Sequence, residues 1–278
     1  MARRLSFGWL KPPKVPADGV MSLADHLREL RYRLILSAIV IVVGMIACAF
    51  YYQTLVQLLM QPWMTSVELL KGVKPDLDVT TVLSGVTSPP TLALKICLVG
   101  GLVATCPVWL YQVWAYIAPA LLANEKRYAL TFLAAAIPLF LFGVVVGYVV
   151  LPQGITVMMT FTPDVTGLTN LLEIGDFLNL MLVLMLVFGI GLVMPVVVIA
   201  LNLMGVVSGA ALQKARSFVI FGCFVFTTAA TPGGDPFSML ALAIPMTVLF
   251  LVAEQICHGN DRRRRKKLAA QGLLVEQD

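Results

Sequence analysis

Residues 177–203 read FLNLMLVLMLVFGIGLVMPVVVIALNL, and no side chain in this stretch is charged. A helix needs about 20 consecutive apolar residues to cross the hydrocarbon core of a bilayer, so this stretch predicts a transmembrane helix. The whole chain has the same character, because 59% of its 278 residues are hydrophobic and only 13% are charged. Soluble domains carry about 25% charged residues. We therefore expect an all-α, polytopic integral membrane protein.

Five further apolar runs flank this one and predict six transmembrane helices in total. We expect them at about 34–52, 92–117, 129–151, 177–203, 217–230 and 237–253. Residues 22–34 form an amphipathic lead-in that continues directly into the first span. Residues 53–90 read as a polar stretch, and Pro152 begins a second one. The predicted organisation is a basic, proline-containing tail at 1–20, a transmembrane domain at 21–255 and a basic tail at 256–278.

The distribution of cations predicts the orientation of the chain. All Lys and Arg residues except Lys71, Lys74 and Lys95 lie in the two tails, in the lead-in at 22–34 or in the even-numbered loops. Because cytoplasmic loops are enriched in Lys and Arg, we expect both termini in the cytoplasm and the spans in the cytoplasmic membrane. The run of cations at 262–267 reads as an anchor to anionic lipid.

Prolines inside four spans predict bent helices and a curved bundle, because each proline removes one backbone hydrogen bond. These prolines are Pro107, Pro138, Pro195 and Pro245. Spans 217–230 and 237–253 are shorter than the bilayer requires, so we expect them to thin the membrane locally or to pair with neighbouring helices. Gly143 and Gly147 in the third span are a weak signal of a close helix contact.

Catalytic and cofactor-binding patterns are missing from the sequence. The two histidines, His26 and His258, lie outside the predicted spans, and there is no Gly-rich phosphate-binding loop. We expect no cofactor, no metal and no enzyme activity. The net charge of +5 comes from tails and loops, which argues against a nucleic-acid binder. The five cysteines read as small packing residues. A six-helix small-molecule carrier and a membrane-embedded enzyme remain alternatives at this point.

Two carboxylates stand among cations on the predicted cytoplasmic face. Glu29 lies in the lead-in helix, and Glu125 lies in the loop between the second and third spans. Spacing alone favours local explanations for both. Glu29 can pair with Arg33 at i,i+4, and Glu125 can be a solvated loop carboxylate beside Lys126 and Arg127.

Four stretches carry a resemblance to a known family. They are DHLRELRYRL at 25–34, LMQPW at 59–63, PVWLYQVWAYIAPALLANEKRY at 107–128 and TPGGDPFSM at 231–239. Together they resemble the TatC family of twin-arginine protein translocase subunits, over about residues 21–254. The resemblance implies a receptor for twin-arginine signal peptides that helps export folded proteins, using the proton-motive force and no nucleotide.

The resemblance also implies where the signal peptide binds. It assigns the arginine pair to Glu29 and Glu125. Beside them it places Leu30, Arg31, Tyr116 and Arg127, with Pro62 near the far end of the apolar part of the peptide. A carboxylate can accept a guanidinium through two hydrogen bonds, which suits one carboxylate per arginine.

The family works with small single-span partners of the TatA and TatB type, within a larger complex in which we expect several copies of this chain. The resemblance places partner-helix contacts at Met194, Met239 and Asp235. Many members have Glu and Gln where this chain has Met194 and Met239. Because an unpaired buried polar group is costly, we expect the partners to be apolar opposite these two residues.

Overall fold

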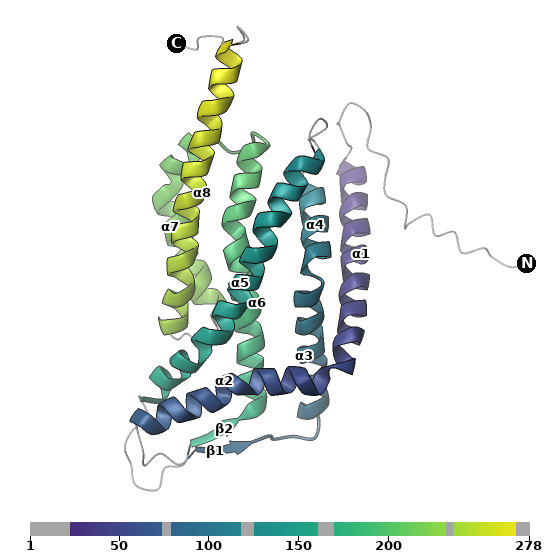
Figure 1. The fold of residues 1–278 in the computed structure, drawn as a ribbon, viewed down its shortest axis with the longest axis vertical. Coiled ribbons are helices and arrows are strands. Elements are labelled where there is room, and N and C mark those ends of the chain that lie inside the picture. The colour runs from purple at the N-terminus through teal and green to yellow at the C-terminus, as the bar shows by residue number, and fades with distance from the viewer. Residues whose placement is uncertain (1–22, 74–78, 118–124, 161–169, 232–235, 271–278) are drawn as a thin grey trace, which may run out of the picture. The chain divides into compact units, whose positions relative to one another are not determined.

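The computed structural model describes residues 23–73, 79–117, 125–160, 170–231 and 236–270, which are almost wholly helical (Figure 1). The elements in order are α1 (Leu23–Phe50), α2 (Tyr52–Val73), β1 (Val79–Val82), α3 (Ser88–Ala104), α4 (Cys106–Ile117), α5 (Glu125–Thr160), β2 (Asn170–Glu173), α6 (Ile174–Leu203), α7 (Gly209–Ala230) and α8 (Pro236–Ala270). The chain forms two compact units. The first unit comprises Met1–Val56 and Ala93–Ile137, and the second comprises Gln57–Leu92 and Pro138–Asp278.

The described part of the chain contains five helices that match predicted spans, and a sixth if a bent pair is counted as one span. Five helices, α1, α5, α6, α7 and α8, are each long and apolar enough to cross a membrane. The bent pair α3 and α4 passes the same test when the two are taken together as one span. The lead-in and the first span form one continuous helix, as predicted.

The second span is broken at Thr105, where α3 and α4 meet at 64°. Pro107, the second residue of α4, cannot continue the hydrogen-bond ladder of α3. Side chains add hydrogen bonds at the break. Trp109 Nε1 donates to Leu102 O at 2.9 Å, and Thr105 Oγ1 donates at 2.7 Å to Gly101 O, which also accepts from the backbone N–H of Thr105. The bend predicted from Pro107 is therefore confirmed.

Two predicted polar stretches are partly helical. Residues Tyr52–Val73 form α2 with Pro62 inside it, although the sequence predicts only a polar stretch there. Pro152 does not end the third span, because α5 continues through it to Thr160. Thr156 Oγ1 donates to Pro152 O at 2.8 Å. Helices of membrane proteins accept internal proline where neighbouring groups satisfy the backbone, so proline alone is a poor stop signal.

The prediction that the last two spans are short is wrong for the helices. α7 has 22 residues and α8 has 35. At about 1.5 Å per residue, α7 reaches about 33 Å, which matches a hydrocarbon core of about 30 Å. The sequence-based boundaries stop at charged residues, whereas the helices continue through them. α8 also runs through the cations up to Lys266, whose side chains are exposed.

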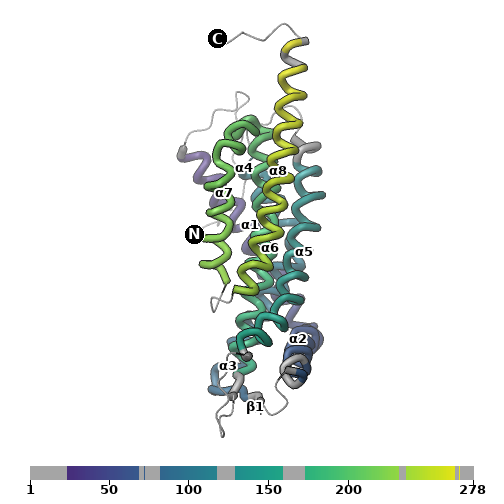
Figure 2. Tube along the Cα trace, turned by 90° about the vertical axis from the view of Figure 1, so that its left-hand side faces the viewer, coloured from purple at the N-terminus to yellow at the C-terminus, as the bar shows by residue number. Residues whose placement is uncertain are grey.

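α6 forms the centre of the second unit. A stripe of residues at helical spacing is fully buried there: Leu178, Met181, Leu184, Phe188 and Leu192. α8 packs against both α6 and α7, and these three helices lie side by side in Figures 1 and 2.

Gly143 and Gly147 bring α5 against α6. A Cβ atom at Gly147 would lie 2.9 Å from Met185 Cα, and one at Gly143 would overlap Phe188 O. The close contact suggested by the spacing of the two glycines is confirmed.

β1 and β2 form a short parallel pair in the second unit, with Val79 opposite Asn170 and Val82 opposite Glu173. β2 leads directly into α6, so the pair ties the segment before α3 to the segment before α6. The prediction of an all-α fold holds apart from this one pair.

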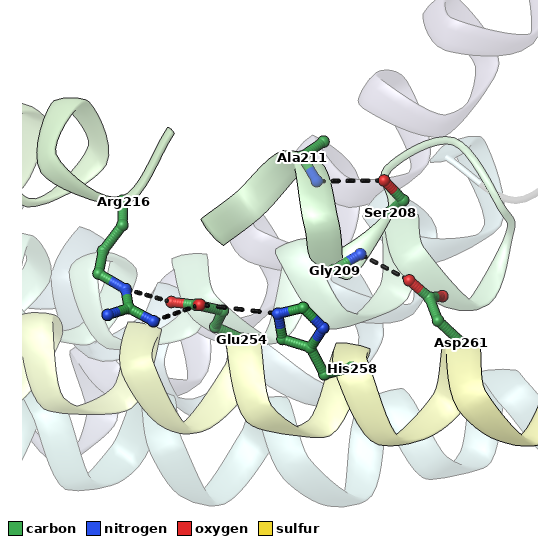
Figure 3. Close-up of polar contacts among 7 residues, drawn as sticks. All are labelled: Ser208, Gly209, Ala211, Arg216, Glu254, His258 and Asp261. Atoms are coloured by element: carbon green, nitrogen blue, oxygen red, sulfur yellow. Dashed lines mark hydrogen bonds and ion pairs between the residues drawn. The ribbon is translucent and has the colours of Figure 1, made fainter. Parts of the chain in front are cut away.

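An ion-paired cluster joins α7 to α8 (Figure 3). Glu254 is fully buried on α8, and Arg216 of α7 donates to both of its oxygens, from Nε at 3.0 Å and from Nη2 at 2.7 Å. His258 Nε2 lies 3.8 Å from the same carboxylate. We call these three residues the α7–α8 clamp. The sequence analysis places Arg216 in a loop and His258 in a tail, and both assignments are corrected here.

The start of α7 is capped twice, which explains why the helix begins at Gly209. Ser208 Oγ accepts a hydrogen bond from Ala211 N at 3.2 Å, and Asp261 Oδ2 accepts one from Gly209 N at 2.6 Å (Figure 3). Asn202 Nδ2 donates to Asp261 Oδ1 at 2.9 Å. Capping by side chains satisfies N–H groups that the helix cannot. The ends of α6 and α7 are thereby fixed to α8.

Replacing Gly143 with Ala is expected to destabilise the second unit by about 1–3 kcal/mol, because the new methyl group overpacks the α5–α6 contact. The matched control is Gly222→Ala in α7, where an added Cβ meets nothing within 4 Å. Thermal unfolding of both variants in detergent checks this. Equal unfolding temperatures would contradict the close contact.

Replacing Arg216 with Leu is expected to lower the stability of the second unit, because it leaves the buried Glu254 carboxylate without its countercharge. Arg216→Leu combined with Glu254→Gln should recover part of that loss. Lys214→Leu, at an exposed position on the same helix, is the control. Chemical unfolding measures the three variants. Equal free energies of unfolding for Arg216→Leu and Lys214→Leu would show that the clamp does not stabilise the protein.

Candidate functional site

Three helix ends meet at one end of the first unit. The His26 ring of α1 stacks on the Tyr116 ring of α4, with centroids 4.6 Å apart and an interplanar angle of 17°. Trp114 of α4 stacks on Phe132 of α5 at 4.8 Å. Phe132 lies about two turns after Glu125, the first residue of α5. The starts of α1 and α5 therefore lie near the end of α4, which brings the backbone of Glu125 to the same end as Glu29.

Glu29 is the most informative side chain of this region. It is only 3% exposed. Its Oε1 accepts two hydrogen bonds from Arg33, from Nε at 2.9 Å and from Nη2 at 2.5 Å. Its Oε2 is buried and has no hydrogen-bond partner among the described residues. Buried polar atoms are nearly always paired, so this oxygen is an exception that needs an explanation.

Gln112 of α4 completes the arrangement. Its Oε1 accepts a hydrogen bond from Arg33 Nη1 at 3.2 Å, and the residue is 8% exposed. Arg33 therefore bridges the two helices, with one carboxylate oxygen on one side and one amide oxygen on the other. The sequence-based i,i+4 pair of Glu29 and Arg33 is present, but it occupies only half of the carboxylate.

The other predicted signal-peptide residues fall into three groups. Leu30, Arg31 and Tyr116 lie in the first unit on α1 and α4, with Leu30 and Tyr116 half-buried and Arg31 exposed. Glu125 and Arg127 belong to the first turn of α5, and their side chains lie outside the described residues. Pro62 is buried on α2 in the second unit, where Ser66 Oγ donates to Pro62 O at 2.7 Å.

The predicted partner-contact residues belong to the second unit. Met194 on α6 is 48% exposed, although most of that helix is packed. Met239 on α8 is half-buried, and its Sδ lies 3.0 Å from Thr228 Oγ1 of α7. Asp235 lies outside the described residues. Met194 is therefore the more open of the two methionines.

Sequence reasoning missed the α7–α8 clamp and Gln112. A signal for the clamp was present. Arg216 and Glu254 carry opposite charges and lie at similar distances from the short connection between α7 and α8, so antiparallel helices bring them together. Gln112 carried no such signal, because a neutral amide in an apolar run shows its partner only in three dimensions. The five cysteines are all free, and four of them are buried.

Comparison with known proteins identifies the family. The family model described as "Sec-independent protein translocase protein (TatC)" matches residues 25–245. A relative of that name from Frankia casuarinae is 36% identical over 88% of this chain and 68% of its own length. One from Xylanimonas cellulosilytica is 34% identical over 90% of this chain and 88% of its own length.

The fold agrees with the same assignment. A crystal structure of the "Twin Arginine Translocase Receptor- TatC in DDM" superposes with a TM-score of 0.68 and 29% identity, covering 84% of this chain and 99% of that one. These matches do not favour the carrier alternative. A multi-pass membrane protein with a broken second span, whose sequence matches this translocase model over most of its length, is a transport component: the chain belongs to the TatC family of Sec-independent protein translocase proteins.

Proposed function

We propose that this chain is the signal-peptide receptor and core subunit of a twin-arginine translocase, and that it helps export folded proteins using the proton-motive force. One observation supports the proposal best. Glu29 holds a buried carboxylate with one oxygen unused, at the end of the first unit where α5 begins with Glu125. A relative of known structure, similar to this chain over most of its length, is described as a twin-arginine translocase receptor.

The chemistry of the site suits an arginine pair. A guanidinium is planar and presents several N–H donors, which match carboxylate oxygens in direction and spacing. Glu29 Oε2 is an acceptor that lacks a donor among the described residues, and a peptide guanidinium supplies one. Glu125 takes the second arginine in this proposal. Leu30, Arg31, Tyr116 and Arg127 flank the pair, and Pro62 lies toward the far end of the apolar segment of the peptide.

The site requires a cytoplasmic location, because signal peptides approach from that side. We place both termini in the cytoplasm and the spans in the cytoplasmic membrane, with cytoplasmic tails at 1–20 and 256–278. The exposed cations from Arg262 to Lys266 support this, since the end of α8 then meets the anionic inner leaflet.

The same proposal includes helical partners of the TatA and TatB type, and further copies of this chain. Met194 is 48% exposed on α6 and lies one turn after Ile190, which is 46% exposed, so this face of the helix is available to an apolar partner. Met239 and Asp235 complete the proposed partner surface toward the start of α8. Since Thr228 already faces Met239, an apolar partner suffices opposite this residue.

Changing Glu29 or Glu125 to Gln is expected to weaken binding of a twin-arginine signal peptide by about tenfold or more, because each change removes a charge-assisted hydrogen bond. Binding of a labelled peptide to the full chain in nanodiscs measures this, with a twin-lysine peptide for comparison. Asp25→Asn, one turn before Glu29 and paired with Arg28, serves as the control. Unchanged peptide binding by both glutamate variants would reject the site.

A photo-crosslinker at position 194 is expected to capture a single-span partner protein in intact membranes. The control is the same probe at Leu192, which lies two residues away on α6 and is fully buried. Equal yields at the two positions, or no yield at position 194, would rule out the proposed contact.

A further inference from the structure

We propose that Arg33 and Gln112 make Glu29 selective for guanidinium over ammonium groups. The inference rests on the proposed receptor function and goes beyond it, because it assigns specificity to two residues that do not themselves supply the carboxylate. It follows from how the Glu29 carboxylate is occupied.

Two buried glutamates of this chain are paired with arginine in different ways. In the clamp, Arg216 donates to both oxygens of Glu254, so that carboxylate is saturated by its own chain. At Glu29, both donating nitrogens of Arg33 converge on Oε1, and Oε2 is left buried without a partner among the described residues. An arginine facing a carboxylate commonly engages both oxygens, so the one-sided arrangement calls for a cause.

Gln112 supplies that cause. Its amide oxygen accepts from Arg33 Nη1 at 3.2 Å and draws that edge of the guanidinium toward α4. The guanidinium is rigid, so fixing Nη1 and the Nε–Nη2 edge together fixes its plane. Arg33 then holds Oε1 without reaching Oε2. Gln112 and Arg33 act as positioning residues, and Glu29 offers the peptide one oriented oxygen.

Charge gives a second reason for selectivity. Glu29 and Arg33 together carry no net formal charge, so the pair attracts a distant cation only weakly. Binding must then depend on directed hydrogen bonds. A guanidinium is planar and weakly hydrated, whereas an ammonium is compact and strongly hydrated. Arg33 therefore weakens the electrostatic attraction on which lysine binding would depend. It leaves Glu29 Oε2 free to accept a directed hydrogen bond from an arginine.

The experiment measures dissociation constants of synthetic twin-arginine and twin-lysine signal peptides for the full chain in nanodiscs. Arg33→Gln keeps a donor near Oε1 and removes the positive charge, and we expect it to tighten twin-lysine binding by about tenfold. Arg33→Lys keeps the charge and should leave twin-lysine binding unchanged. Gln112→Leu should weaken twin-arginine binding by about tenfold with little effect on the twin-lysine peptide.

Arg28→Gln is the matched control, because it removes the same charge from the same helix at an exposed pair with Asp25. It should leave the ratio of the two affinities unchanged. Unfolding temperatures of all variants separate specificity from stability.

The inference is overturned if Arg33→Gln and Arg28→Gln change twin-lysine binding equally. It is also overturned if Gln112→Leu weakens both peptides alike with a lower unfolding temperature, since Gln112 would then only pack. If the wild-type chain discriminates between the two peptides and all variants keep the wild-type ratio of affinities, the inference is rejected and the receptor function still holds. A wild-type chain that binds both peptides equally rejects both.

Discussion

Hydrocarbon offers no hydrogen-bond partner, and this constraint governs the polar groups of the molecule. Helices satisfy their own backbone hydrogen bonds. Side-chain partners are needed only where a helix is interrupted or where a charge is buried. At the break between α3 and α4, the Trp109 indole donates to Leu102 O and the Thr105 hydroxyl donates to Gly101 O. On α8, Arg216 donates to both oxygens of the buried Glu254 carboxylate. Among the described residues, these polar groups find their hydrogen-bond partners within the chain.

Glu29 departs from this pattern, which is why it draws attention as a site. It is nearly as buried as Glu254, yet its own chain uses one oxygen and leaves the other. A fully satisfied carboxylate stabilises helix packing, whereas a half-satisfied one is an energetic cost unless a ligand completes it. Under the proposed receptor function, Glu254 therefore has a structural role and Glu29 a binding role within one chain. That distinction comes from hydrogen-bond geometry rather than from burial or charge.

Much of the fold was predictable from the sequence, and the failures have physical causes. Apolar runs located the membrane-spanning helices, and the start of the third span and the whole of the fourth were placed within a few residues. Boundaries failed where a charged residue or a proline was taken as a helix end. Lys214 and Arg216 lie inside α7, where Arg216 pairs with Glu254 of α8, and Pro152 lies inside α5. α2 was missed because its apolar content is too low for a span.

The strand pair has a consequence for how the chain is made. The chain between β1 and β2 contains α3, α4 and α5, so the pairing of the two strands brings together the two ends of that segment. Ribosomal synthesis delivers the segments in order, and β2 is not yet present while those helices enter the bilayer. Parallel strands also require such a long crossover. The pairing of Val79–Val82 with Asn170–Glu173 is thus a late event, which can form only once everything between the two strands has been delivered.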